Sequence, residues 1–196
     1  MSVTVIMEGG ASGQPNSKEF NTAWRKAMSS FFAKAGLDGR RPAVVPAGSR
    51  SEAYNLFAER VAKKDLKDFV VLLVDSEVPL LDQNMWAHLA KRPGDKWKKP
   101  TKASNADCHL MVVVMETWFL ACPAAIKTVL KTDPVKAIPQ RNLEDIDKAE
   151  VEQLFKRWGY EKGTHATKLI EATEPNAVRD RCPAAAHFLN HLDAIC

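Results

Sequence analysis

The sequence predicts an α/β fold in which helices cover both faces of a mostly parallel sheet. Between residues 1 and 132, short apolar stretches alternate with stretches whose apolar residues recur at helical spacing. The short stretches are apolar throughout rather than at every second position, which is typical of strands buried on both faces of a parallel sheet. Apolar residues make up 45% of the 196 residues, enough for one well-buried core.

Four apolar stretches are expected to be strands, because they are short, continuously apolar and bounded by polar or turn-forming residues. The stretch at residues 76–107 is polar and rich in Lys and Pro, and it is predicted to be a long loop. The four expected strands are residues 2–7, 42–46, 69–74 and 109–115.

Helices are expected between these strands. Trp24 and Phe31 belong to a set of apolar residues at helical spacing, which predicts a first helix ending near Lys34. A second helix is predicted over residues 51–64, where serines stand at the expected start. Glu116 is expected to open a further helix directly after the last strand.

The C-terminal part of the chain has no strong strand pattern. We expect residues 1–132 to form the α/β domain and residues 133–196 to form a helical C-terminal extension packed on the same core. The helices expected in this extension are residues 143–158, 163–173 and 183–195.

The charge balance is mildly basic, with a formal net charge of +4 and a pI near 8.9. This is compatible with an anionic partner such as nucleic acid but does not require one. No apolar stretch reaches the roughly 18 residues that span a membrane, and no signal-peptide pattern precedes the first strand. The four cysteines lack zinc-ligand spacing. We therefore expect a cytoplasmic protein with reduced thiols and no membrane partner.

Acidic residues follow three of the expected strands. Glu8, Asp75 and Glu116 each stand at a strand end, and Glu77 lies two residues past Asp75, on the same side if the backbone is extended. Ligands of open parallel sheets bind beyond the carboxyl ends of the strands, so these side chains are expected to meet. Grouped carboxylates repel each other unless a cation neutralises them, and hard oxygen ligands suit Mg²⁺ or Mn²⁺. We predict a metal site made by Glu8, Asp75 and Glu77, with Glu116 as a further catalytic carboxylate.

A structural role remains open for each acid taken alone. An acid at a strand end is often part of a turn, and Glu116 would favour a helix N-terminus without any further function. Gly9 and Gly10 follow Glu8 and are expected to let the backbone turn close to the metal site. They do not form a nucleotide phosphate loop, because the Gly-Lys-Ser/Thr ending of that motif is absent.

Several basic and aromatic residues are candidates for binding nucleic acid. Arg50 begins the second helix, and Trp97 stands among Lys and Arg in the predicted loop, where phosphate pairing and base stacking would suit a single strand. Lys162, His165 and Lys168 lie at an expected helix start, where they could contact phosphate. Ordinary surface charges, and a loop with Trp97 folded back, are the alternatives.

The strand-end motifs "IMEGG" and "LLVDSE" resemble those of the TOPRIM domain, which has a Glu after its first strand and an Asp-x-Asp pair after its third. Glu8 matches the first acid, and Asp75 and Glu77 match the pair. The second acid of the pair departs from the TOPRIM pattern, because Glu77 is one methylene longer than Asp.

The resemblance extends to a small TOPRIM-like family that is often encoded near ATPases in anti-phage defence or mobile-element clusters. Its further motifs here are "METWFLA" and "YEKGTHATK". The resemblance implies an Mg²⁺-dependent nuclease that cuts DNA or RNA in a defence or toxin-like system, with an ATPase as a possible partner.

Two alternatives stay open. The chain could be a non-catalytic partner subunit that binds nucleic acid or an associated ATPase, and the Asp-Ser-Glu departure favours this reading. A receiver-like domain phosphorylated at Asp75 is less consistent with the sequence, because such domains carry paired acids after the first strand, whereas Glu8 stands alone before two glycines.

Overall fold

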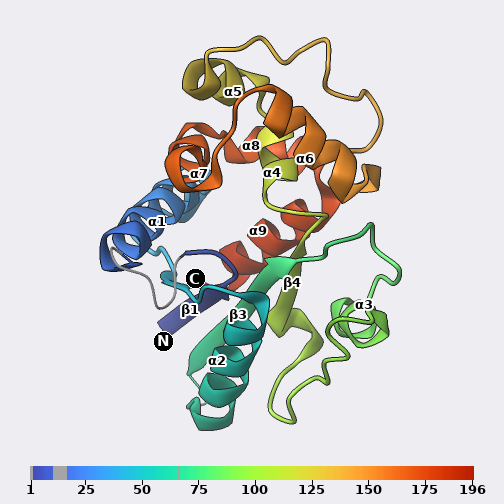
Figure 1. Cartoon of the computed structure of the whole chain (residues 1–196). Helices are drawn as coiled ribbons and strands as arrows, with labels where there is room; N and C mark the ends of the chain where they lie inside the picture. Colours follow the sequence, from blue (N-terminus) through green and yellow to red (C-terminus); the bar gives the residue numbers. More distant parts are fainter. Residues whose placement is uncertain (1, 11–16, 66) are drawn as a thin grey trace.

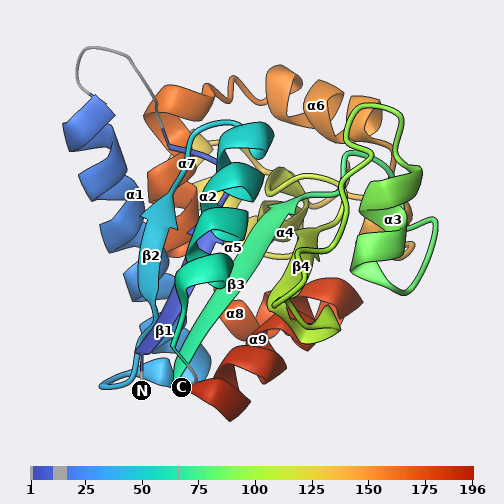
Figure 2. The ribbon, with the colours of Figure 1, turned by 90° about the horizontal axis from the view of Figure 1, so that it is seen from below.

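The computed structural model of the chain describes residues 2–10, 17–65 and 67–196. The whole chain is shown in Figure 1, and its described residues contain a sheet of four parallel strands in the order β2-β1-β3-β4 (Figure 2). The predicted α/β class with a parallel sheet is confirmed. The strands are β1 Ser2–Met7, β2 Ala43–Pro46, β3 Asp68–Asp75 and β4 Cys108–Met111.

Helices precede, connect and follow the strands, as the apolar spacing predicts. Helix α1 is continued by one π-helical turn, Ala33–Leu37. Helix α2 begins with a capping box in which the Ser49 side chain and the Glu52 carboxylate each bond the other's backbone N–H. The helices are α1 Ser17–Phe32, α2 Arg50–Lys63, α3 Met85–Lys91, α4 Glu116–Leu120, α5 Pro123–Leu130, α6 Lys148–Arg157, α7 Lys162–Ala172, α8 Pro175–Arg181 and α9 Pro183–Ile195.

The order of the strands explains which helix covers which face. From β1 the chain runs outward to β2 and then crosses to β3 on the other side of β1. Right-handed crossovers place the two connecting helices on opposite faces of the sheet. Accordingly, α2 packs on β1 and β3 on one face, while α1 and α9 lie on the other (Figure 2). The adjacent ends of β1 and β3 form the crevice where ligands bind in open α/β sheets.

Helix α9 joins the C-terminal part of the chain to the core of the sheet. The side chain of Phe188 is fully buried. Its ring centroid lies 6.1 Å from that of Phe32 in α1, 6.2 Å from that of Trp118 in α4 and 5.2 Å from that of His109 in β4. Side chains from residues 133–196 therefore belong to the same hydrophobic core as the sheet. The division into two segments at residue 132 stays a prediction.

The last strand is shorter than predicted. Sequence pattern extends it over residues 109–115, but β4 ends at Met111. Its neighbour β3 ends at Asp75, which pairs with Met111, so the residues that follow have no strand beside them. The backbone instead turns, and the N–H of Met115 donates to Oδ1 of Asp75 at 3.0 Å.

The predicted loop over residues 76–107 is also only partly a loop. It contains α3, which Asn84 caps by accepting a hydrogen bond from the N–H of Ala87 at 3.1 Å. Trp86 and Leu89 bury the inner side of this short helix. Its seven residues, about two turns, are too few to give a clear helical period in the sequence. Helix α8 is likewise missing from the sequence prediction. None of the helices in the described parts of the chain is long and apolar enough to cross a membrane.

The shared core predicts that the chain unfolds as one unit. Replacing Phe188 by Ala should lower the free energy of unfolding by about 3–5 kcal/mol, because it removes a fully buried ring and leaves a cavity. Urea denaturation followed by circular dichroism and by tryptophan fluorescence should give coincident transitions. Asn190→Ala, at an exposed position of the same helix, is the control and should change little. Two separate transitions would show that residues 133–196 unfold independently.

Candidate functional site

Asp75 ends the strand β3, between β1 and β4, and it is only 4% exposed. Its Oδ1 accepts the N–H of Met115 at 3.0 Å. Burial raises the pKa of this carboxyl well above its ordinary value, and the charges of Glu8 and Glu116 raise it further. A buried acid whose ionised form is disfavoured is a group that a bound cation would stabilise.

Glu8 directly follows β1 and continues its ladder, since its N–H donates to the carbonyl of Leu73 in β3 at 3.0 Å. Its Oε2 accepts the backbone N–H of Asp75 at 3.1 Å and lies 3.3 Å from Nη1 of Arg50. Burial raises the pKa of Glu8, against the opposing effects of the Arg50 charge and the Asp75 N–H. The Asp75 N–H and the Arg50 guanidinium therefore together hold the Glu8 carboxylate beside Asp75.

Glycine is needed at both positions after Glu8, because of the backbone conformation there and the neighbouring atoms. Both have positive φ, 111° for Gly9 and 83° for Gly10. A Cβ on Gly9 would lie 2.6 Å from the indole of Trp24, and one on Gly10 would lie 2.7 Å from Cβ of Pro46. The predicted close turn beside the acids is present, and side chains other than hydrogen would not fit it.

Glu77 reaches the site through a turn rather than through the extended backbone that we predicted. Its φ is +70°, a conformation that non-glycine residues rarely adopt outside constrained sites. Its N–H donates to the carbonyl of Val113 at 2.7 Å, which holds this turn against the segment after β4. Its Oε2 lies 2.6 Å from Nζ of Lys148 and 3.7 Å from Nη2 of Arg92.

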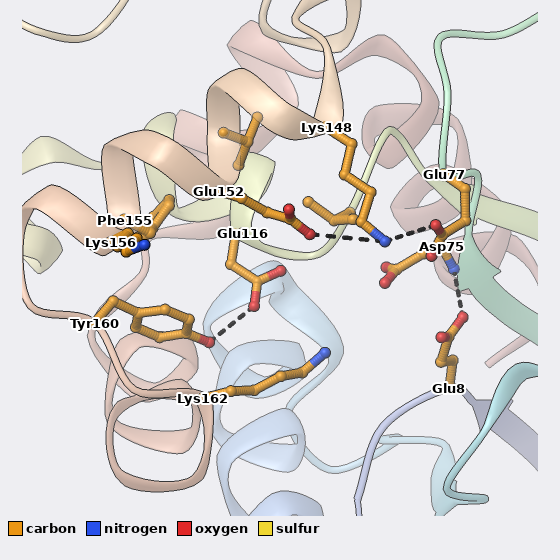
Figure 3. A pocket seen from close by; sticks show the side chains of 12 residues that line it. Glu8, Asp75, Glu77, Glu116, Lys148, Glu152, Phe155, Lys156, Tyr160 and Lys162 are labelled. Atoms are coloured by element: carbon orange, nitrogen blue, oxygen red, sulfur yellow. Dashed lines mark hydrogen bonds and ion pairs between the residues drawn. The ribbon is translucent and has the colours of Figure 1, made fainter.

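These three acids form one cluster (Figure 3). One carboxylate oxygen from each of Glu8, Asp75 and Glu77 lies within 4.8 Å of the others. Each acid uses one oxygen for hydrogen bonds, and its second oxygen accepts none from the described residues. The candidate ligands are therefore three carboxylates, whose oxygens are hard donors and whose positions are held by these bonds. Such a set fits Mg²⁺ or Mn²⁺ and would not suit a soft metal ion.

Glu116 stands near this cluster but outside it. As predicted, it opens a helix, α4. Its Oε1 accepts the hydroxyl of Tyr160 at 2.9 Å. Burial and the charge of Glu116 both raise the pKa of the Tyr160 phenol, which keeps that group a hydrogen-bond donor. Glu116 acts on the cluster through its charge, which contributes to the raised pKa of Asp75.

All four acids line one pocket of about 390 Å³. Helix α6 and the segment that leads into α7 provide the walls opposite the strand ends. In Figure 3, Lys148 points toward Glu77, and Lys162 extends from the side of Tyr160 toward the acids. The lining residues are Glu8, Asp75, Glu77, Val114, Glu116, Lys148, Val151, Glu152, Phe155, Lys156, Tyr160 and Lys162.

The residues predicted to bind nucleic acid are divided by the structure. Lys162 lines the pocket and makes no hydrogen bond or ion pair with the part of the chain that the structure describes. His165 is turned back on its own helix, where Nδ1 accepts the N–H of Glu161 at 3.0 Å. Lys168 is exposed further along α7 and does not line the pocket.

Arg50 and Trp97 lie inside the protein. The Arg50 side chain is 12% exposed, and its guanidinium bonds Glu8, the carbonyl oxygen of Asp75 and the carboxylate of Asp95. Trp97 is 9% exposed, stacks on Tyr54 at 4.6 Å and lies 5.1 Å from the Arg50 guanidinium. Their positions do not support contact with nucleic acid. Arg50 instead orients the acids, and Trp97 packs beside it.

Seven of the lining residues were not predicted to belong to the site, and two of these, Lys148 and Tyr160, bond the acids. Lys148 begins α6, where Glu152 four residues later gives the spacing of an ordinary surface ion pair. Tyr160 stands in the quoted motif "YEKGTHATK", but nothing in the sequence links it to Glu116. Both come from the helical C-terminal extension, so only the tertiary structure brings them to the strand ends.

Comparison with known proteins identifies a family. The model of the DUF4276 family, described as a domain of unknown function, matches residues 21–193. The matched range includes Asp75, Glu77 and Glu116, whereas Glu8 precedes it. No match was found among curated proteins or among solved structures.

The bonds of Arg50 predict a structural role for its charge. Arg50→Met should lower the free energy of unfolding by about 2–4 kcal/mol, because among the described residues Glu8 would then have no arginine partner and Asp95 would keep Arg92 alone. Arg60→Met, at an exposed position on the same helix, is the matched control and should change stability by no more than about 0.5 kcal/mol. If urea denaturation gave the same change in the free energy of unfolding for both variants, Arg50 would not be needed to hold the acids.

The raised pKa of Asp75 predicts how stability depends on pH. Because the folded state binds this proton more tightly than the unfolded state, the metal-free protein should lose stability as pH rises from about 4, the ordinary carboxyl pKa, through the raised pKa of Asp75. Asp75→Asn keeps an oxygen for the Met115 N–H and removes the charge. It should raise the melting temperature in EDTA at pH 7.5, whereas Asp180→Asn, an exposed control, should not. An unchanged or lower melting temperature for Asp75→Asn would contradict this.

Proposed function

The chain belongs to the DUF4276 family, and we propose that it is a divalent-metal-dependent nuclease that hydrolyses phosphodiester bonds of DNA or RNA. One observation carries the proposal. Three carboxylates from adjacent strand ends lie within 4.8 Å of one another at the crevice where open α/β sheets bind ligands. The resemblance of "IMEGG" and "LLVDSE" to TOPRIM motifs supports the same assignment.

Glu8, Asp75 and Glu77 would hold the ion, through the oxygens that the described residues leave without hydrogen bonds. A bound Mg²⁺ or Mn²⁺ would polarise the phosphate and lower the pKa of a coordinated water. Arg50 and the Asp75 N–H hold Glu8 in position, and Lys148 holds Glu77. The acids are therefore placed for a cation before one binds, which reduces reorganisation during the reaction.

The charge of the pocket explains why an ion would be needed. Five carboxylates and three ammonium groups line it, so negative charge is in excess. A phosphodiester would be repelled until a divalent cation reverses this balance. We therefore expect nucleic acid to bind at this site only when the metal is present.

The remaining polar groups have roles that follow from their positions. Lys162 and Lys156 would pair with phosphates of the bound strand. Glu116 bonds Tyr160 through Oε1, and its Oε2 accepts no hydrogen bond from the described residues. It would take a proton from the attacking water as the water oxygen bonds to phosphorus, while the P–O bond to the leaving oxygen breaks and solvent protonates that oxygen. Tyr160 would keep Glu116 in the orientation needed for that transfer.

A second candidate is a non-catalytic subunit that binds nucleic acid or an associated ATPase. The ion pair of Glu77 with Lys148 at 2.6 Å favours it, because an ammonium group already neutralises the acid that departs from the TOPRIM pattern. On either proposal the protein would act in the cytoplasm. The defence or toxin-like setting rests on the resemblance alone.

The nuclease proposal predicts cleavage of labelled DNA or total RNA in Mg²⁺ or Mn²⁺ and none in EDTA. Glu8→Gln and Asp75→Asn should each slow cleavage by at least about 100-fold, because each removes a charge that holds the ion. Asp180→Asn should cleave at the wild-type rate. Metal titration by calorimetry separates the two candidates. Metal binding that needs Glu8 and Asp75, without cleavage of any substrate, would favour the non-catalytic subunit.

A further inference from the structure

The candidate metal ligands lie at the base of a pocket and not on an open surface. Asp75 is 4% exposed. One wall of the pocket is α6, with Lys148, Phe155 and Lys156, and another is the segment from Tyr160 to Lys162 (Figure 3). These two walls and the strand ends together line the pocket that contains Asp75.

The size of the pocket limits what can enter. Its volume of about 390 Å³ is near the lower end of the roughly 300–1,000 Å³ of pockets that enclose a small ligand. A base-paired duplex carries its phosphates on the outside of a wide rod, and the second strand would meet the walls before a phosphate met Asp75. Enzymes that act on a base in an enclosed pocket take single strands or nucleotides extruded from the duplex, and the same steric limit would apply to a phosphate at the base of this pocket.

The walls suit an unpaired nucleotide in chemistry as well as in size. Lys156 and Lys162 are exposed at the sides of the pocket, where they can pair with successive phosphates. Apolar surface for a sugar or a base comes from the half-buried ring of Tyr160, behind which Val114 and Val151 are buried. The pocket thus combines basic and apolar walls above the acids.

We propose that the site takes unpaired nucleic acid, a single-stranded segment or strand end, and rejects continuous duplex. This inference rests on the proposed nuclease function and specifies its substrate. The shape of the pocket would select the substrate. The walls from α6 and the start of α7 would let one strand approach the metal ligands and would exclude a paired second strand. DNA and RNA share this property when unpaired, so the inference concerns pairing and not the sugar.

Binding can be measured apart from cleavage by using Ca²⁺ in place of Mg²⁺. Fluorescence anisotropy would compare a labelled single-stranded oligonucleotide with the same strand in a blunt duplex. We expect the single strand to bind at least about tenfold more tightly. Lys162→Met should weaken single-strand binding and reduce the slope of log Kd against log salt by about 0.7, the value for one phosphate contact. Lys127→Met, an exposed lysine outside the pocket, should leave the slope unchanged.

Cleavage in Mn²⁺ of the single strand, the duplex and a duplex with an unpaired central bulge completes the test. Cutting of the single strand and of the bulge, with the paired regions spared, supports the inference. Equal binding and cutting of single strand and duplex would overturn the inference and leave the nuclease proposal standing. Absence of binding and cutting for every oligonucleotide, with either metal, would overturn both.

Discussion

The repulsion between carboxylates gathered at one edge of a parallel sheet is the constraint on which this site depends. Parallel pairing places the ends of β1 and β3 side by side, and with them Glu8 and Asp75. Burial then raises the pKa of both acids. Burying these ionised carboxylates costs free energy. Arg50 offsets part of that cost, because its guanidinium bonds Glu8 and the carbonyl of Asp75. The remaining unfavourable charge is what a divalent cation would neutralise.

The groups that surround the acids come from distant parts of the chain. Arg50 begins α2, Lys148 begins α6 and Lys162 begins α7. The strand ends bring together the clustered acids, whereas helices of the C-terminal part of the chain supply the walls and most of the basic groups. An α/β domain that ended at residue 132 would expose Asp75 more widely and would lack both Lys148 and Tyr160. The extension therefore belongs to the site as well as to the core.

Arginine and lysine have different positions here. Arg50 and Arg92 are partly buried and share Asp95, whose side chain is 5% exposed, so they form a network beneath the acids. Lys156 and Lys162 are exposed and have no partner among the described residues. The planar, multiply bonded guanidinium suits the internal position, and the flexible ammonium suits contact with a mobile phosphate. The inner charges thus hold the acids, and the outer charges are available to a ligand.

By itself the sequence determined the fold class and the acids of the site, because both depend on local patterns. Continuous apolar stretches identified buried parallel strands, and acids at their ends identified Glu8, Asp75 and Glu116. The short helix α3 and the early end of β4 were not predicted, since seven residues are too few for a clear helical period and the end of a strand depends on its neighbour. Tertiary structure alone decided that Arg50 and Trp97 face inward, that Glu77 arrives through a turn with positive φ, and that Lys148 and Tyr160 close the pocket. Most of these contacts join residues far apart in the sequence, 45 positions for Arg50 and Asp95 and 44 for Tyr160 and Glu116, and no local pattern carries information over that separation.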